Sequence, residues 1–336
     1  MAALRLRIEV EKLRLHEPFR ISGHIWTEVD VVVATLEEGA RRGRGEACGV
    51  YYLNDTAQSL AAALEAVRTD IETGIDRDGL QRLLPSGGAR NAVDCALWEL
   101  DAQRAGIPVW KLAGLPTPKP LLTTFTLGAE DPETMAAGAR RHARARALKL
   151  KLTGDLDLDI ARVQAVRAAR PEVWLGVDAN QGYVVEALPA LIAALEIEHV
   201  ALLEQPLRRG REAELEGFRS PIPIAADESV LDLSELPAAV RRFDIVNIKL
   251  DKCGGLTAGL AMAREARRLG LGVMVGNMVG TSLAMAPGFV LGQLCDVVDL
   301  DGPIFLKRDR EPGVAYDNGH IWCGEQVWGG AVASPA

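Results

Sequence analysis

The sequence predicts an α/β protein: a modified TIM barrel of the (β/α)7β kind, preceded by an α+β capping domain. From Leu121 onward, short apolar runs alternate regularly with helical segments, a pattern typical of parallel strands joined by helical crossovers. Three strands and alanine-rich helices precede this alternation, and a glycine-rich tail follows it. At 336 residues, the chain is long enough for a barrel and something extra.

The first part of the chain has the pattern of strands followed by helices. Residues 16–23 carry loop signals between the first two strands. Thr56 opens a helix, and a second helix ends at Gly106. The strands are expected at residues 4–15, 28–36 and 43–48. We predict a capping domain at 1–116, a barrel at 117–302, and a tail at 303–336 that packs back on the capping domain.

Eight barrel strands and seven helices follow from the alternation, with no helix after the last strand. The strands are predicted at residues 123–127, 148–152, 174–178, 201–204, 222–225, 245–250, 272–276 and 297–301. The helices are predicted at residues 132–145, 157–169, 185–196, 212–218, 233–241, 256–269 and 282–293.

Composition excludes several classes of function. A net charge near −8 gives no electrostatic case for nucleic acid or an anionic membrane. No apolar run approaches the length of a membrane span, and the N-terminus lacks the pattern of a signal peptide. The five cysteines are scattered and odd in number, so we expect reduced thiols, no structural zinc and a cytoplasmic protein. We also expect a homo-oligomer that acts on a small molecule.

Three carboxylates follow three consecutive barrel strands. Asp178, Glu204 and Asp227 are 26 and 23 residues apart, about one strand-helix unit each. Each could simply cap the next helix, but together they meet at the carboxyl end of the barrel, where barrel enzymes keep their chemistry. Like charges so close require a cation among them, and oxygen ligands suit a hard divalent ion such as Mg²⁺. The sequence therefore predicts a magnesium site.

Lysines flank this predicted site. Lys149 and Lys151 alternate with leucines on the second strand, so both point into the barrel. Lys249 lies on the sixth strand, across the barrel, and shares a face with Asn247; Lys252 follows in the loop as a supporting residue. Lys151 and Lys249 could remove an α-proton from one face of a substrate and return a proton to the other. Such a base needs a lowered pKa, which Lys149 and the metal would provide as neighbouring cations.

Two further carboxylates, Asp299 and Asp301, point the same way at the end of the eighth strand. They could be a capping or solvated pair, but two carboxylates facing a cavity are better explained by a cationic group of the ligand. The implied reaction is removal of an α-proton next to a metal-bound carboxylate, which gives an enediolate.

Two other features carry no predicted chemistry. Gly254 and Gly255 follow the sixth strand without the rest of a phosphate-loop fingerprint, so we interpret them as a tight turn. Arg90, Asp94 and Glu99 are interpreted as charges on a helix surface or at a domain contact.

The motifs resemble those of the enolase superfamily, muconate-lactonizing-enzyme subgroup, over nearly the whole chain. The resemblance implies Mg²⁺ held by the three carboxylates, two lysine bases, and supporting roles for Asn180, Glu228 and Lys252. The matching motifs are Lys149-x-Lys151, Asp178-Ala-Asn180, Glu204-Gln-Pro206, Ala226-Asp227-Glu228-Ser229 and Lys249-Leu-Asp-Lys-Cys-Gly-Gly255.

Within the subgroup, Asp299-Leu-Asp301 resembles the pair by which dipeptide epimerases hold the α-ammonium group of the substrate. The resemblance implies a 1,1-proton transfer at the α-carbon of the C-terminal residue of a dipeptide, with an Ala-Glu-like substrate as one option. It also implies that capping loops near residues 16–26 and 49–55 sense the substrate side chains. His24 stands where Ala-Glu epimerases can carry an arginine, so His24 and Lys149 join the candidate substrate-binding residues.

Other functions stay open. A racemase of N-acylated amino acids would use the same metal and lysines without a cationic ammonium group in its substrate. A cycloisomerase or syn-dehydratase could use one lysine only. A non-catalytic carboxylate-binding protein is a further alternative, which metal-dependent exchange of the α-proton would separate from the enzymes.

Overall fold

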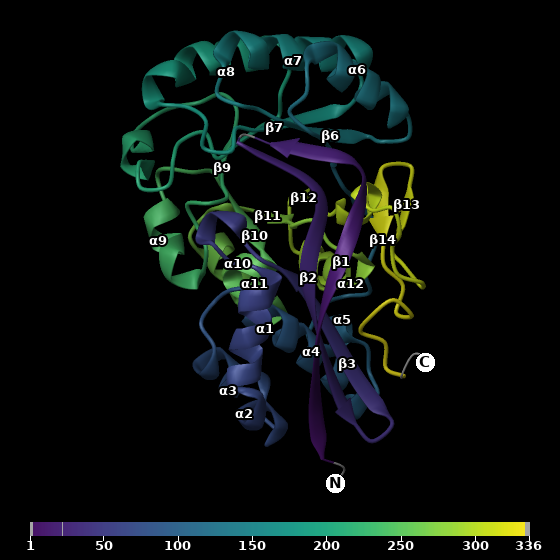
Figure 1. The fold of residues 1–336 in the computed structure, drawn as a ribbon. Coiled ribbons are helices and arrows are strands. Elements are labelled where there is room, and N and C mark those ends of the chain that lie inside the picture. Colours follow the sequence, from purple (N-terminus) through teal and green to yellow (C-terminus); the bar gives the residue numbers. More distant parts are fainter. Residues whose placement is uncertain (1–2, 22, 333–336) are drawn as a thin grey trace.

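A three-stranded antiparallel sheet begins the computed structural model, which describes residues 3–21 and 23–332 (Figure 1). Its strands lie in the order β1 (Leu4–Ile21), β2 (His24–Glu38) and β3 (Arg41–Cys48). Apolar residues on one face of this sheet pack against the helices that follow and form the core of the N-terminal region.

The first two strands form one hairpin that is longer than predicted. The loop predicted at residues 16–23 is wrong, because β1 runs on through most of it; Ser22 lies outside the described residues. An irregular register accommodates Pro18, after which Phe19 pairs with Trp26. These two aromatic side chains pack in one apolar cluster, and their burial stabilises the extended hairpin.

Five helices follow the sheet, and the predicted helix signals are confirmed. Thr56 accepts a hydrogen bond from the backbone N–H of Ser59 at 3.0 Å in a capping box. Gly106, in the left-handed conformation, ends the longest helix. The helices are α1 (Ala57–Ala66), α2 (Arg68–Glu72), α3 (Arg77–Leu83), α4 (Gly88–Ala105) and α5 (Val109–Leu112), and a 3₁₀ turn, η1 (Tyr51–Leu53), precedes them.

Eight parallel strands form the second sheet, in sequence order. The backbone N–H of Thr124 donates to Val298 O at 3.0 Å, so the first and last strands lie side by side and the sheet closes into a barrel. This confirms the predicted fold class. The strands are β5 (Phe125–Leu127), β6 (Ala147–Lys151), β7 (Trp174–Asp178), β8 (Leu202–Glu204), β9 (Ile224–Ala226), β10 (Ile245–Lys249), β11 (Gly272–Gly276) and β12 (Val297–Val298).

Most barrel helices lie where they were predicted, and the exceptions are the segments that follow β8 and β9. The helix predicted at 212–218 is wrong: only a 3₁₀ turn, η3 (Glu212–Leu215), forms there, bounded by Gly210 and Gly217 at positive φ. The predicted helix at 233–241 breaks into η4 (Leu233–Glu235) and a single α-helical turn. The helices are α6 (Pro132–Arg141), α7 (Leu156–Ala169), α8 (Leu188–Ile197), after the turn η2 (Val185–Ala187), α9 (Leu236–Ala239), α10 (Leu250–Cys253), α11 (Leu256–Arg268) and α12 (Ser282–Gly292). Among the described residues, no helix has both the length and the apolar character needed to cross a membrane.

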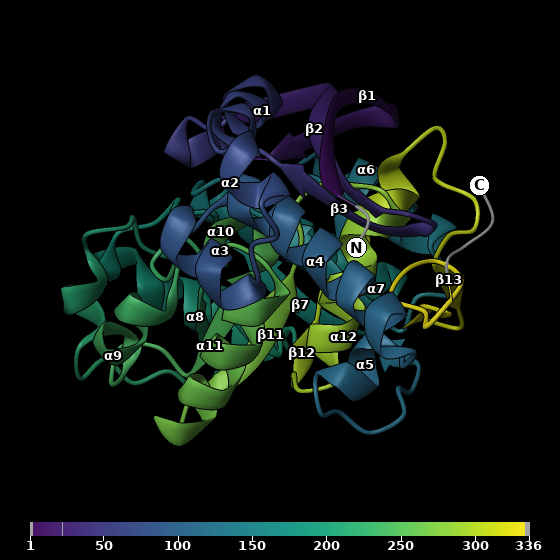
Figure 2. The ribbon, with the colours of Figure 1, turned by 90° about the horizontal axis from the view of Figure 1, so that it is seen from below.

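Helix α4 lies between β3 and the barrel helix α11 (Figure 2). Its charges Arg90 and Asp94 are buried against the barrel, so of the two predicted alternatives, helix surface or domain contact, the domain contact is confirmed. Arg90 donates to Cys253 O at 2.6 Å, and Asp94 accepts from the backbone N–H at the start of α11. A Cβ atom on Gly254 would lie 2.3 Å from Arg90 Nε, and one on Gly255 would lie 2.5 Å from Asp94. The two glycines form a tight turn, as predicted, which also allows this close approach.

The tail returns along the N-terminal region after the turn η5 (Gly302–Phe305). The backbone N–H of Lys307 donates to Arg14 O at 2.9 Å, and Trp328 donates to Arg44 O at 2.9 Å. Glu99, also predicted as a surface or contact charge, is buried, and its Oε1 lies 2.6 Å from Nη2 of Arg44. Strands β13 (Ala315–Asp317), β14 (His320–Trp322) and β4 (Leu121–Leu122) form a small antiparallel sheet. The domain limits at 116 and 302 stay predictions, and residues 333–336 of the tail lie outside the described residues.

Candidate active site

A cavity lies at the carboxyl ends of the barrel strands, below the hairpin of β1 and β2. The space between its walls is about 780 Å³, part of which is open solvent. Barrel residues, including Lys151, Lys249 and Asp301, line one side, and residues of the capping region, including Trp26 and Tyr51, line the other. In Figure 1 the hairpin extends toward β6 and β7.

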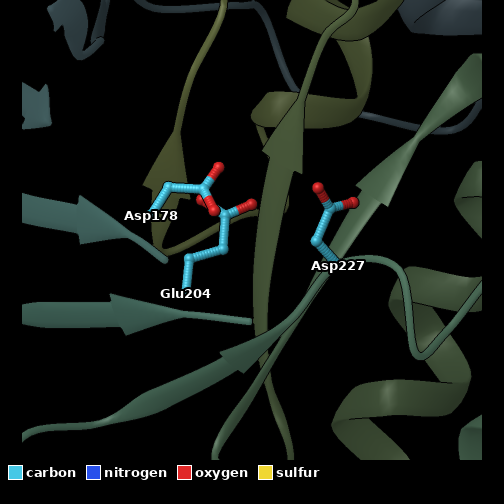
Figure 3. Close-up of side chains that lie close together, drawn as sticks. All are labelled: Asp178, Glu204 and Asp227. Carbon is cyan, nitrogen blue, oxygen red and sulfur yellow. The ribbon is translucent and has the colours of Figure 1, made fainter. Parts of the chain in front are cut away.

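Three carboxylates meet at the floor of the site. Asp178 ends β7, Glu204 ends β8, and Asp227 directly follows β9. Each offers one oxygen, and these oxygens all lie within 4.8 Å of one another (Figure 3). All three side chains are buried. Buried like charges at this separation are unfavourable without cations between them, and an oxygen-only donor set of this kind fits Mg²⁺.

Neighbouring polar groups orient these carboxylates. Asn247 donates from Nδ2 to Glu204 Oε1 at 2.6 Å. Lys252 donates to Asp227 Oδ1 at 2.7 Å and to the backbone oxygen of the same residue, which fixes the carboxylate relative to its own backbone. Asn247 was not predicted as a site residue, although its place two residues before Lys249 on one strand face was a signal for it.

The two predicted bases lie on opposite strands of the barrel, β6 and β10. Lys151 Nζ is 2.6 Å from Asp178 Oδ2, and Lys249 Nζ is 2.7 Å from Asp227 Oδ2. The sequence argument expected neighbouring cations to lower the pKa of a lysine base. Burial alone would lower the pKa of Lys249, but the carboxylates around it, Asp227 first, raise that pKa well above its usual value. A cation among these carboxylates would act in the opposite direction.

The carboxylate pair Asp299 and Asp301, predicted at the end of the last strand, follows β12 (Val297–Val298), and its two members are buried with different partners. Asp299 pairs with Lys149 and with the hydroxyl of Thr124. Burial opposes ionisation of Asp299, but the charge of Lys149 outweighs it, and the pKa of Asp299 is lowered. Asp301 accepts the backbone N–H of Thr126 at 2.6 Å, and burial together with the charge of Asp299 raises its pKa to about 6. Asp301 is therefore the member of the pair without a cationic partner among the described residues.

Three polar atoms along the cavity have no hydrogen-bond partner in the described part of the chain. They are Asn180 Oδ1, Glu228 Oε2 and the hydroxyl of Tyr52. Burial and the charges of Asp227 and Asp178 raise the pKa of Glu228 to about 8. Buried polar atoms are nearly always satisfied in folded proteins, so these atoms are available to a ligand or to water.

Aromatic side chains cover the cavity from the capping side. We call Phe19, Trp26, Tyr51 and Phe305 the aromatic roof. Ring centroids are 4.7 Å apart for Phe19 and Phe305, 6.4 Å for Phe19 and Trp26, and 5.4 Å for Trp26 and Tyr51. His24 is exposed, lies 4.6 Å from the ring of Tyr51, and is not among the residues that line the cavity.

Two family models match the chain. The first, the N-terminal domain of mandelate racemase and muconate lactonizing enzyme, matches residues 3–114. The second, an enolase C-terminal domain-like family, matches residues 134–324. The chain therefore belongs to the enolase superfamily.

Individual relatives indicate which group within the superfamily the chain belongs to. The chain is 40% identical over 316 residues to L-Ala-D/L-Glu epimerase of Escherichia coli K12, covering 94% of this chain and 98% of that one. It is 39% identical over 249 residues to N-acetyl-D-glutamate racemase of a Pseudoalteromonas species, covering 74% and 78%. Within the superfamily the chain falls in the dipeptide epimerase group, and it is an isomerase.

Solved structures agree with this placement. An enolase family member from Agrobacterium tumefaciens with homology to dipeptide epimerases, with bound sodium and L-Ala-L-Glu, has a TM-score of 0.93 at 38% identity. The match covers 97% of this chain and 100% of that one. The dipeptide epimerase of Methylococcus capsulatus, complexed with Mg and L-Arg-D-Lys, has a TM-score of 0.90 at 29% identity and covers 96% and 97%.

Proposed function

We propose that this protein is a Mg²⁺-dependent dipeptide epimerase that inverts the α-carbon of the C-terminal residue. One observation carries the proposal: Lys151 and Lys249 lie on opposite strands of the barrel and line the same cavity, and each touches a carboxylate of the buried triad. A carbon acid bound between two such lysines presents one face to each, which is the requirement of a 1,1-proton transfer.

The triad of Asp178, Glu204 and Asp227 would hold Mg²⁺. When bound, the metal would neutralise the charge that develops on the substrate carboxylate as the α-proton leaves. Lys151 and Lys249 then have complementary roles. In each direction one lysine, as the neutral amine, accepts the α-proton at Nζ, and the other, as the ammonium, donates a proton to the opposite face.

The other site residues would support this chemistry. Asn247 and Lys252 hold two of the triad carboxylates in position through the hydrogen bonds described above. Asn180 and Glu228 line the cavity with unpaired oxygens and would contact the substrate or water. Lys149 would set the charge of Asp299. His24 lies outside the cavity lining, so it would act at most through Trp26 and Tyr51.

Asp301 would bind the α-ammonium group of the dipeptide, together with Asp299. A buried carboxylate without a cationic partner is costly, and a cationic group of the ligand would remove that cost. This observation favours a dipeptide over the second candidate substrate, an N-acylated amino acid, which the similarity to N-acetyl-D-glutamate racemase keeps in view.

Hydrogen exchange in D₂O tests the proposal. With Mg²⁺, L-Ala-L-Xaa dipeptides should gain deuterium at the α-carbon of the second residue and appear as a mixture of two epimers. The N-acetyl amino acids should react more slowly. If they exchange faster than every dipeptide, the protein is an N-acylamino-acid racemase.

A further inference from the structure

The aromatic roof defines the side chain that the substrate carries at the reacting carbon. Building on the proposed epimerase function, we infer that this side chain is apolar, either aliphatic or aromatic, and does not carry the carboxylate of glutamate.

The strand order determines this direction. The triad lies at the ends of β7 to β9, and Asp299 and Asp301 follow β12, which is opposite β8 in the closed sheet. The substrate carboxylate and amide nitrogen therefore extend toward opposite walls of the barrel. Lys151 and Lys249 occupy the two faces of the reacting carbon. The barrel interior below is filled by buried side chains such as Lys149. The direction left for the substrate side chain is upward, toward the capping region.

The groups in that direction are apolar. Phe19, Trp26, Tyr51 and Phe305 line the cavity on the capping side, together with Ile21 and Val279 at their edges. Burying a leucine or phenylalanine side chain against such a surface is favourable by the usual measure of buried apolar area.

A glutamate side chain would find no cation there. Among the described residues that line the cavity, the cationic ones are Lys149, Lys151 and Lys249, and each already pairs with a carboxylate. Glu228 and Asp301, the lining carboxyl groups without a cationic partner in the described part of the chain, offer no positive charge to it. His24 contacts the rings of Trp26 and Tyr51, but it is exposed and is not among the residues that line the cavity. An unpaired buried carboxylate is strongly disfavoured.

Four dipeptides with a common first residue test the inference: L-Ala-L-Leu, L-Ala-L-Phe, L-Ala-L-Glu and L-Ala-L-Lys, each with Mg²⁺. We expect kcat/KM for the leucine or phenylalanine dipeptide to exceed that of the glutamate and lysine dipeptides by about tenfold or more. A glutamate or lysine dipeptide that reacts as well as the apolar ones would overturn the inference about the side chain and leave the proposed function intact. Absence of α-proton exchange with all four would instead contradict the proposed function on which it rests.

A pair of charge insertions isolates the roof. Trp26→Arg places a cation in the roof and should shift the kcat/KM ratio of L-Ala-L-Glu to L-Ala-L-Leu toward glutamate by about tenfold. Ile25→Arg adds the same charge one residue away, at a side chain that is 54% exposed and does not line the cavity, so its ratio should match wild type. Circular dichroism and thermal melting establish that both variants fold. An unchanged ratio in folded Trp26→Arg, or equal shifts in both variants, would contradict the role of the roof.

Discussion

Lys249 donates a hydrogen bond from Nζ to Oδ2 of Asp227 at 2.7 Å. A proposed base therefore touches a proposed metal ligand, and the two functions share one carboxylate. Without a metal, this carboxylate stabilises the charged lysine. Mg²⁺ held by the carboxylates would weaken the attraction that keeps the proton on Lys249. The contact would therefore couple metal binding to the protonation of the proposed base.

The first prediction concerns the triad. Asp227→Asn should lower Mg²⁺ affinity at least about 100-fold, because it removes a charged ligand and not merely a group that orients one. Isothermal titration with MgCl₂ measures the affinity directly. Asp317→Asn is the control, since its side chain is 77% exposed on the surface. Unchanged Mg²⁺ binding in Asp227→Asn would mean that the ligand set is wrong.

The second prediction separates dipeptides from N-acyl amino acids. Asp301→Asn should raise KM for a dipeptide, because a charge-assisted hydrogen bond to the ammonium group is worth about 1.5–3 kcal/mol, or about one to two decades of affinity. The N-acetyl form of the dipeptide has no ammonium group and should lose little. Asp301 is the better target of the pair because Asp299 is already neutralised by Lys149. Equal losses on both substrates would argue against ammonium binding at this site.

The third prediction concerns the contact between α4 and the barrel. Gly254→Ala should destabilise the protein by about 2–4 kcal/mol, from the strained positive φ and from a Cβ that would collide with Arg90. Gly210→Ala is matched to it, with a positive φ but no atom within 4 Å of the added Cβ; it should cost only about 1 kcal/mol. Urea denaturation gives both values. Equal destabilisation by the two substitutions would show that Arg90 can move away from the added Cβ without strain.

The fourth prediction concerns pH. Asp251 is buried, and burial raises its pKa to about 7, although Cys48 and Asn91 donate hydrogen bonds to it. Because the folded pKa lies above the unfolded value, this group contributes stability that is complete below about pH 4 and is lost as the pH rises through 7. Asp251→Asn has no carboxyl group to ionise at this position. The free energy of unfolding of the variant, measured relative to wild type, should therefore rise by about 1 kcal/mol or more from pH 5 to pH 8. Denaturation midpoints at the two values measure this, and a difference independent of pH would contradict the shifted pKa.

The barrel and the triad could be predicted because the same sequence pattern, an apolar strand followed by a helix, repeats along the chain. Each barrel strand is a short apolar run, and parallel strands bring their carboxyl ends to one edge, so Asp178, Glu204 and Asp227 had to meet. The extension of β1 through residues 16–21 could not be predicted in this way. It depends on tertiary packing of Phe19 and Trp26, which overrides the local loop signal of Pro18.

The parts of the site that were missed act through hydrogen bonds across the barrel. Asn247 reaches Glu204 two strands away, and Thr124 reaches Asp299 from the residue just before β5, where the sheet closes. Neither partner follows from spacing along one strand. The position of His24 was equally out of reach, since only the folded hairpin places Trp26 at the cavity and His24 outside it.

Exchange in D₂O with Lys151→Ala and Lys249→Ala tests the two proposed lysine bases most directly. Both epimers of a dipeptide that the wild type converts are incubated with each variant, with Lys119→Ala, on the surface, as the control. We predict that neither variant epimerises its substrate, that each exchanges the α-proton of one epimer only, and that the two variants select opposite epimers. Epimerisation at the wild-type rate by Lys249→Ala would contradict the two-base mechanism.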